Sequence, residues 1–370
     1  MFKFRNDNLQ GSPNKRSRRI GWWLFVTVRV HILALFTATF LFMGAAVTHA
    51  QQLLFVSSLG SDEVLLYDGT TGAFIGVFVT QMSGGLVNPQ GLVLGRADIL
   101  YVSSGLTGEV LRYDGRGAFI DAFVSAGSGR LNVPIGLVFG PDGNLYVSSG
   151  VTGEVLRYDD ETGAFIDAFV TQMSGGLVNP QGLVFGPDRN LYVSNSNTNE
   201  VLRYNGTTGD FIDAFVTAGS GGLNVPIGLV FGPDGNLYVS SGGTNEVLRY
   251  NGATGAFIDA FVTQGSGGLI LPQGLVFGPD GNLYVSSGTN EVLRYNGTTG
   301  DFIDAFVTAG SGGLDDPSFL IFLGPSVIEG EGGGGGCSVA SAGAPVSVPL
   351  YLLAPVLFVI IRRVLRALRG

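Results

Sequence analysis

The residue types that most often carry chemistry are unevenly placed in this chain of 370 residues. Both histidines, His31 and His49, precede residue 51, and the single cysteine, Cys337, follows residue 336. Residues 51–336 therefore contain no imidazole and no thiol, which removes the common nucleophiles, general bases and transition-metal ligands. A single cysteine also excludes an internal disulfide. These residues argue against most catalytic schemes, and we expect no bound cofactor.

Charge divides the chain into three parts. Seven Lys or Arg and one acid precede residue 51, and four Arg and no acid follow residue 336. Residues 51–336 hold 28 acids and nine Arg, a balance of 9 − 28 = −19, and no Lys. Such a surface repels phosphate backbones and favours solubility, so we expect no binding to nucleic acid.

Acidic turns raise the question of a calcium site. Asp-Gly pairs begin at Asp142, Asp234 and Asp280. Calcium takes about 6–8 oxygen ligands, whereas Asp-Gly is a preferred two-residue hairpin turn. We interpret these pairs as turns and expect no metal.

These turns belong to an internal repeat that dominates the sequence. The aromatic of a Leu-Tyr-Val-Ser-Ser core recurs at spacings of 46, 45, 46, 46 and 46 residues. The six positions are Phe55, Tyr101, Tyr146, Tyr192, Tyr238 and Tyr284. No unit has the 3.6-residue apolar period of a helix, which disfavours helical and leucine-rich solenoids.

Each unit contains four short apolar runs separated by turn residues. In residues 228–268 the runs are GLVFG, LYVSS, EVLRY and AFIDAFV, and the turns are PDGN and NGATG. Four-stranded units of this length are typical of propeller blades, in which neighbouring blades cover both faces of each sheet. The sequence therefore predicts an all-β fold, a six-bladed β-propeller of four-stranded blades.

The two ends of the repeat region complement each other. The first unit begins with a second strand, Leu53–Ser58, and lacks a first strand. The last unit is followed by Ser318–Gly324, which matches a first strand and has no second strand after it. We predict that these segments pair, so that the N- and C-terminal strands close the ring without a seam of exposed edges.

The repeat resembles the NHL-type repeats of six-bladed propellers, including gluconolactonase-like and streptogramin-lyase-like relatives. The shared residues are the Pro-x-Gly before the first strand, Asp-Gly-Asn-Leu-Tyr-Val and Asn-Glu-Val-Leu-Arg-Tyr, within residues 53–324. The resemblance implies the fold, whereas function has to be argued from the site, because this fold carries enzymes, binding modules and scaffolds.

Enzymes of these kinds would place metal ligands or a histidine at the central channel, which the first strands line. The predicted first strands are Gly91–Gly95, Gly136–Gly140, Gly182–Gly186, Gly228–Gly232, Gly274–Gly278 and Phe319–Gly324. None contains Asp, Glu, His, Asn or Gln, so no catalytic residue can be carried over from the relatives. We favour a non-enzymatic binding module, and the alternative is a gluconolactonase-like or streptogramin-lyase-like envelope enzyme.

The longest loops join successive blades and form a candidate binding rim. The loops Thr80–Gln90 and Thr171–Gln181 are rich in Gly, Ser, Gln and Asn. Ordinary solvated connections would have the same composition. The ligand class stays open as a protein, glycan or matrix partner, and we expect the propeller itself to be a monomer. The candidate residues are Gln81, Met82, Asn88, Gln172, Met173 and Asn179.

A second recurring pattern predicts structural ion pairs. An Arg in the third strand and an Asp in the fourth strand occur together in blades two to six, whereas blade one has Leu66 and Gly76. Their joint loss in blade one indicates that the two residues face each other across the hairpin. The pairs are Arg112 and Asp121, Arg157 and Asp167, Arg203 and Asp213, Arg249 and Asp259, and Arg294 and Asp304.

The N-terminal 50 residues are typical of an export signal. Basic residues at 15–19 precede an apolar run, Ile32–Phe42, and small residues predict cleavage after Ala50. An uncleaved membrane anchor is the alternative. We therefore assign residues 1–50 to a signal peptide and residues 51–324 to the propeller.

The C-terminal part predicts attachment to the envelope. Residues 325–345 form a Gly-rich linker with Cys337, and residues 346–370 form an apolar helix with an Arg tail. This order resembles the sorting signals of bacterial surface proteins, which implies processing near Cys337; a plain C-terminal membrane helix is the alternative. With the Arg tail in the cytoplasm, the propeller would lie on the outer face of the envelope.

Overall fold

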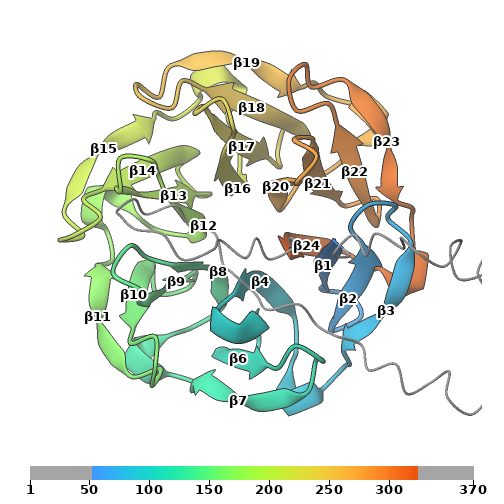
Figure 1. Ribbon diagram of the computed structural model, residues 1–370. Helices are drawn as coiled ribbons and strands as arrows, with labels where there is room; N and C mark the ends of the chain where they lie inside the picture. The colour runs from blue at the N-terminus through green and yellow to red at the C-terminus, as the bar shows by residue number, and fades with distance from the viewer. Residues whose placement is uncertain (1–51, 324–370) are drawn as a thin grey trace, which may run out of the picture. The chain divides into compact units, whose positions relative to one another are not determined.

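The computed structural model describes residues 52–323, which form a six-bladed β-propeller of four-stranded antiparallel sheets (Figure 1). The predicted all-β fold and blade number are therefore confirmed. Among residues 52–323, no helix is long and apolar enough to span a membrane. The expected signal peptide with Ala50, the linker with Cys337 and the C-terminal tail lie outside the described residues.

In five blades the strands follow one another outward from the channel, and blade one instead takes its innermost strand from the C-terminal end of the described chain. Three-residue 3-10 segments precede the first strands, and one further segment, η2, lies in a hairpin turn. The strands are β1 (Leu53–Ser58), β2 (Glu63–Asp68), β3 (Phe74–Val79), β4 (Pro89–Leu94), β5 (Leu100–Ser104), β6 (Glu109–Tyr113), β7 (Phe119–Val124), β8 (Pro134–Phe139), β9 (Leu145–Ser149), β10 (Glu154–Tyr158), β11 (Phe165–Val170), β12 (Pro180–Phe185), β13 (Leu191–Asn195), β14 (Glu200–Tyr204), β15 (Phe211–Val216), β16 (Pro226–Phe231), β17 (Leu237–Ser241), β18 (Glu246–Tyr250), β19 (Phe257–Val262), β20 (Leu275–Phe277), β21 (Leu283–Ser287), β22 (Glu291–Tyr295), β23 (Phe302–Val307) and β24 (Pro317–Leu323). The 3-10 segments are η1 (Ser83–Gly85), η2 (Arg96–Asp98), η3 (Ser128–Arg130), η4 (Ser174–Gly176), η5 (Ser220–Gly222), η6 (Ser266–Gly268) and η7 (Ser311–Gly313).

The hydrophobic core lies between the blades and explains the near-continuous apolar runs. Each of the six buried clusters combines side chains of two neighbouring blades. Tyr146 of β9, for example, meets Phe169 of its own blade and Phe185 of the next blade edge to face, with ring centroids 4.9 and 5.0 Å apart. The second strands of blades two to six are buried along their whole length, because a neighbouring blade covers each face.

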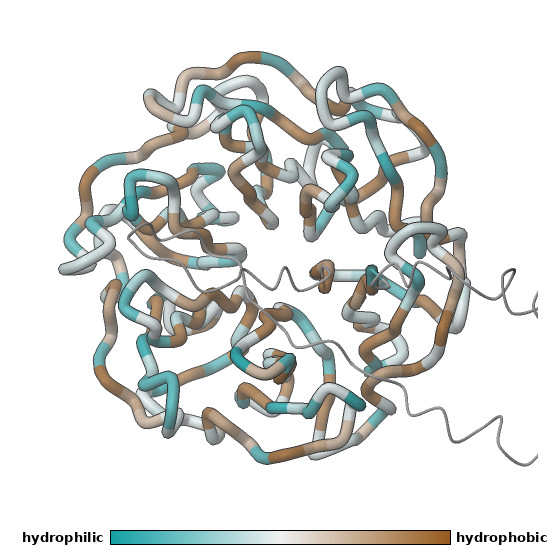
Figure 2. The backbone as a smooth tube through the Cα atoms, in the orientation of Figure 1, coloured by the Kyte–Doolittle hydropathy of each residue, from teal (hydrophilic) through white to brown (hydrophobic). Residues whose placement is uncertain are grey.

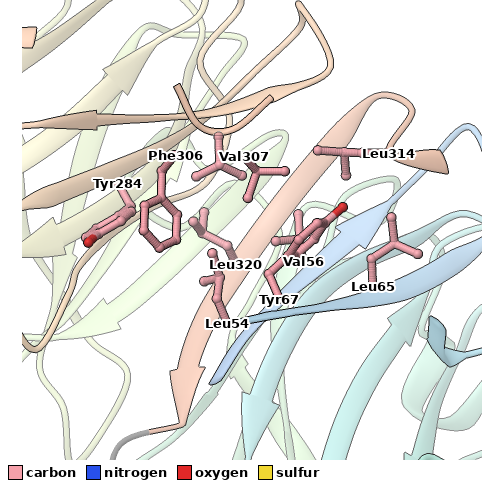
Figure 3. Close-up of a cluster of buried hydrophobic side chains, with 10 residues drawn as sticks. Leu54, Val56, Leu65, Tyr67, Tyr284, Phe306, Val307, Leu314 and Leu320 are labelled. Carbon is pink, nitrogen blue, oxygen red and sulfur yellow. The ribbon is translucent and has the colours of Figure 1, made fainter. Parts of the chain in front are cut away.

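Pairing of the chain ends closes the ring, as the sequence predicts. β24 runs antiparallel to β1, with Leu53 opposite Leu323 and Val56 opposite Leu320. Figure 3 shows the buried cluster at this closure, in which side chains of blades one and six pack together. The six sheets and six buried clusters form a closed ring within residues 52–323.

Candidate functional site

The loops of the propeller lie on two opposite faces. On one face, the links between blades contact the turns between second and third strands. The Gly150 amide, for example, donates to Val133 O over 3.0 Å. We call this face the crossover face. The remaining hairpin turns form the hairpin face. The crossover face consists of residues 80–88, 125–133, 171–179, 217–225, 263–271 and 308–316 and the turns 59–62, 105–108, 150–153, 196–199, 242–245 and 288–290.

Exposed apolar side chains distinguish the crossover face. Within residues 52–323, all exposed large apolar side chains that lie outside the fourth strands belong to this face. Contiguous exposed apolar surface often marks an interaction site. The residues are Met82, Leu106, Val151, Met173, Val178, Val225, Ile270 and Leu271.

Four of these residues, Met82, Met173, Val225 and Leu271, have a positive φ, and the backbone cost is largest for the branched side chains of the last two. Val225 has φ 52° and Leu271 has φ 46°, in the left-handed region that branched side chains rarely adopt. Their side chains are nevertheless 41% and 55% exposed. Hydrogen bonds hold them there, because both amides donate over 2.7 Å to turn asparagines of the preceding blade, Asn199 Oδ1 and Asn245 Oδ1. Such strain, of about 1–3 kcal/mol per residue, is concentrated at functional sites.

The channel strands begin earlier than predicted. β4 and β12 start at proline, two residues before the predicted glycine, and so include Gln90 and Gln181. The predicted absence of amide side chains from the first strands is therefore wrong, although no first strand contains a carboxylate. Gln90 and Gln181 donate through Nε2 to Asn88 Oδ1 and Asn179 Oδ1 over 2.8 and 2.9 Å.

The first strands approach one another closely beside these glutamines. A Cβ on Gly91 would lie 2.3 Å from Ile135 O of the next blade, so the Pro-x-Gly glycine is required by the contact between blades. A fully buried serine of each second strand donates to the corresponding carbonyl of the next blade. These donors are Ser57, Ser103, Ser148, Ser194, Ser240 and Ser286, and their acceptors are the carbonyls of Gln90, Ile135, Gln181, Ile227, Gln273 and Ser318.

The predicted rim residues fall into two groups. Asn88 and Asn179 lie directly before the channel strands and bind the channel glutamines. Met82 and Met173 are exposed and precede η1 and η4, and these segments contact the outer strands of the next blades, β7 and β15. Gln81 and Gln172 are exposed beside the methionines. Sequence reasoning missed Val225 and Leu271, because valine and leucine, unlike glycine and asparagine, give no sign of a positive φ.

The crossover face is acidic. Nine carboxylates lie in its segments or at the first residue of a third strand, against one cation, Arg130. Burial and the neighbouring Asp315 carboxylate raise the pKa of Asp316, whereas a hydrogen bond from Gln273 Nε2 lowers it. The carboxylates are Asp62, Glu63, Glu109, Glu154, Glu200, Glu246, Glu291, Asp315 and Asp316.

Arg130 makes the border between blades two and three unlike the other borders. It has φ 69° at the position where the other links have glycine, and it forms an ion pair with the buried Glu154. Glu154 Oε2 has no hydrogen-bond partner among the described residues. Since the Arg130 charge is neutralised by Glu154, the face has no free cation for an anionic ligand.

The Asp-Gly turns are explained by hairpin structure. Asp142 Oδ2 accepts hydrogen bonds from Asn144 Nδ2 over 2.8 Å and from the Tyr146 hydroxyl over 3.0 Å. Burial, the largest cause, raises the pKa of that tyrosine to about 12. Within residues 52–323, no group of three or more His, Cys, Asp or Glu is arranged to hold a metal ion.

The structure places all five predicted ion pairs in direct contact. Arg203 Nε and Nη2 donate to the two Asp213 oxygens over 3.1 and 2.6 Å, and the other four pairs repeat this bidentate arrangement. The guanidinium also lies 4.9 Å from the Phe215 ring centroid. The hydrogen bonds that Arg203 donates to Asp213 are the main cause that raises the pKa of Arg203. These residues therefore join the third strand to the fourth strand.

Solved structures of other proteins share this fold. Virginiamycin B lyase from Staphylococcus aureus matches with 13% identity and a TM-score of 0.55, covering 74% of this chain and 86% of the lyase. A protein of unknown function from Bacteroides caccae matches with 13% identity and a TM-score of 0.56, covering 74% of this chain and 99% of that protein. A chain of a nidogen/laminin complex matches with 15% identity and a TM-score of 0.56, covering 73% of this chain and 98% of that chain.

These similarities concern the fold alone, since the identities are 13–15%. No family model and no curated protein matches the sequence. The structural neighbours include both a lyase and a chain from a protein–protein complex, so the fold does not decide between catalysis and binding. The crossover face is the candidate site because it combines exposed apolar residues with strained backbone.

Proposed function

We propose that this protein is a non-enzymatic binding module at the outer face of the cell envelope, whose crossover face binds a partner protein. The observation that carries the proposal is the display of Val225 and Leu271, which are apolar, exposed and held in a strained backbone. Asn88, Val133 and Asp316 have the same positive φ at the equivalent positions of other links, so Val225 and Leu271 differ from them by the exposed apolar side chain. Exposed apolar surface supports a bound partner.

The composition of the face indicates the kind of partner. Its segments contain Met, Leu, Val and Ile but no aromatic residue, so they lack the flat rings on which sugars stack. Nine carboxylates lie in or beside the same segments, and one of them, the buried Glu154, is paired with Arg130. Apolar contact with an acidic rim fits a protein surface that presents apolar and basic side chains. A polyanionic partner is disfavoured.

Catalysis is less well supported. One solved lyase of this fold, with 13% identity and a TM-score of 0.53, is described as catalytically inactive after a histidine was replaced by alanine. Residues 51–336 of the present chain contain no histidine, and the first strands of the channel contain no carboxylate. We therefore expect no turnover of quinupristin or of sugar lactones with added divalent metals. Turnover that Gln181→Ala abolishes would overturn this part of the proposal.

Export and attachment complete the proposed function. The basic and apolar leader before Ala50 and the Gly-rich, Cys-containing and Arg-terminated tail support an envelope location. A propeller facing outward from a surface would present its binding face to other proteins.

A matched set of variants tests the binding face. Val178→Asn, Val225→Asn and Leu271→Asn together remove apolar surface from the crossover face, and asparagine tolerates positive φ. Ile120→Asn, Ile166→Asn and Ile258→Asn remove comparably exposed side chains from the outer strands and serve as the control. Residues 51–330 are immobilised and exposed to envelope proteins from the same source.

We expect to find a partner protein that binds the wild type and the control equally well. Its affinity for the crossover variant should be lower by about tenfold or more, which corresponds to a loss of about 1.4 kcal/mol in binding free energy. Equal retention by all three proteins would overturn the proposed face. Capture that resists protease but is lost after glycosidase treatment would identify a glycan in place of a protein.

A further inference from the structure

We propose that two copies of this protein pair through blade one, with β3 of one copy antiparallel to β3 of the other. The observation is a single departure from the repeat. The outer strands of blades two to six all read FIDAFV, whereas β3 reads FIGVFV. This inference is independent of the crossover face.

Blade one lacks the charges that protect the other outer edges. In blades two to six an Arg of the third strand pairs with an Asp of the fourth strand, as Arg203 does with Asp213. At the same register, blade one places Leu66 opposite Gly76. β3 therefore contains no charged residue and no proline, the devices by which natural sheets discourage pairing at an edge.

The edge of β3 has no strand partner among the described residues and is apolar, and η7 contacts this strand where the Phe74 ring lies against Gly312. β3 is the last strand of its sheet, so its outward backbone groups have no strand partner among residues 52–323. Phe74, Ile75 and Val77 are 40%, 45% and 38% exposed. Val77 replaces the alanine of the other five outer strands and adds apolar, β-branched surface. Figure 2 shows hydrophobic segments along the outer strands at the circumference of the ring.

The fold does not require the glycine in β3. Gly76 has no positive φ, and a Cβ added to it would meet no atom within 4 Å. An aspartate could therefore occupy the position, as it does in the five other blades. Crowding therefore does not explain why β3 has a glycine where the other outer strands have an aspartate.

Charge favours a second copy of β3 as the occupant. Antiparallel pairing of a strand with its own copy has two-fold symmetry and satisfies the backbone groups of both edges. The same pairing at another blade would place two Arg–Asp pairs, such as Arg112 with Asp121, at the shared edge, and charged side chains discourage pairing at an edge. Two β3 strands meet without charged side chains.

The net charge of the molecule predicts how this pairing responds to salt. Residues 52–323 hold 26 acids and nine Arg, a balance of 9 − 26 = −17, so two copies repel each other at long range. Salt screens this repulsion and leaves apolar and backbone contacts in place. Pairing should therefore be weak, depend on concentration and strengthen with salt, and the monomer expected from the sequence remains the species at low concentration.

Sedimentation of residues 51–330 tests the proposal over about a hundredfold range of concentration at low and high salt. Leu66→Arg with Gly76→Asp gives blade one the ion pair of the other blades. Val77→Lys places one charge on the edge and serves as a second variant if the first folds poorly. Ala122→Lys at the equivalent position of β7 is the matched control, and thermal melts check that each protein folds.

We expect a dimer whose dissociation constant rises about tenfold or more in both blade-one variants and stays unchanged in Ala122→Lys. A wild type that stays monomeric at every concentration and salt would overturn the proposal. So would equal dimerisation of the wild type and the folded blade-one variants, equal weakening by the control, or a dimer that salt dissociates.

Discussion

The Ser148 hydroxyl donates to the carbonyl oxygen of Gln181 over 2.6 Å and accepts from the Gly136 amide over 2.8 Å. Ser148 thereby joins the first strand of its own blade to the first strand of the next blade. Equivalent serines make the equivalent donation at the other five borders, including the border that the two chain ends close. The contacts form a complete ring around the channel.

Removal of the Ser148 hydroxyl should lower the stability of the folded protein more than the small size of the group suggests. Ser148→Ala would leave a buried amide and a buried carbonyl without their shared partner, which we expect to lower the free energy of unfolding by about 1–3 kcal/mol. Urea unfolding of residues 51–330 measures the change. Ser125→Ala, at an exposed serine in the link before β8, is the control and should stay within about 0.5 kcal/mol of the wild type. Equal stability of the two variants would contradict the structural role of the ring.

The fold could be predicted from the sequence because the pattern of one four-stranded blade occurs six times, so the copies can be compared position by position. Asp-Gly turns set the hairpins, and the missing first strand at one end matches the extra strand at the other. The Arg203–Asp213 contact was predictable for the same reason, since blade one lacks both partners. Comparison between repeats identified residues that depend on each other within one blade.

Contacts between blades could not be predicted in this way. The Ser148 contact occurs in every blade, so no repeat lacks it and reveals its partner. The strain at Val225 depends on how the link meets Asn199 of the preceding blade, which residue types do not encode. The channel glutamines were missed because proline was taken to precede the first strand, whereas β4 and β12 begin at it.

The Arg203–Asp213 pair should show measurable coupling. Both carboxylate oxygens accept from the guanidinium, but Asp213 is 44% exposed, so solvent weakens the interaction. We expect a coupling energy of about 0.5–1 kcal/mol from a double-mutant cycle with alanine. Arg203→Ala should cost more than Asp213→Ala, because it also removes the contact with Phe215. Absence of coupling would show that the pair is held by its neighbours and adds nothing itself.

Asp316 should make stability depend on pH. Because burial and Asp315 raise its pKa in the folded state, the folded protein binds more protons than the unfolded chain between the ordinary and the raised pKa. Its stabilising contribution is therefore complete below an ordinary aspartate pKa of about 4 and is lost as pH rises through the raised value. Asp316→Asn should raise the melting temperature at neutral pH and have little effect at acidic pH.

The substitution at Asp316 suits the backbone, since Asn88 occupies the equivalent position with φ 57°. Asp210→Asn removes one exposed carboxylate from the hairpin face and controls for the change in net charge. An equal gain in melting temperature from both variants would assign the effect to the overall acidity and exclude a local origin at Asp316.

The proposed attachment depends on the tail that follows the propeller. A protein ending at Glu331 retains the described fold but lacks Cys337, the apolar stretch and the Arg cluster. We expect this protein to appear in the medium or periplasm, whereas the full chain stays with the envelope. Fractionation followed by immunoblotting measures the distribution, and a Cys337→Ala full chain separates processing at the cysteine from anchoring by the apolar stretch. Equal membrane retention of the shortened and full proteins would refute attachment by the tail.

Loss of β24 should destabilise the whole ring rather than fray one end. A protein ending at Gly313 lacks β24 and with it Leu314 and Leu320 of the closing cluster. It also loses the Asp315 carbonyl that accepts from Ser58 Oγ over 3.0 Å. The inner edge of β1 is then unpaired, and the border between blades six and one loses its innermost strand. Because each core is shared by two blades, this damage should spread around the ring.

We expect a protein ending at Gly330 to melt in one cooperative transition and the protein ending at Gly313 to melt at a clearly lower temperature or to aggregate through the open edge. Equal melting temperatures for two monomeric proteins would show that β24 is dispensable for closure.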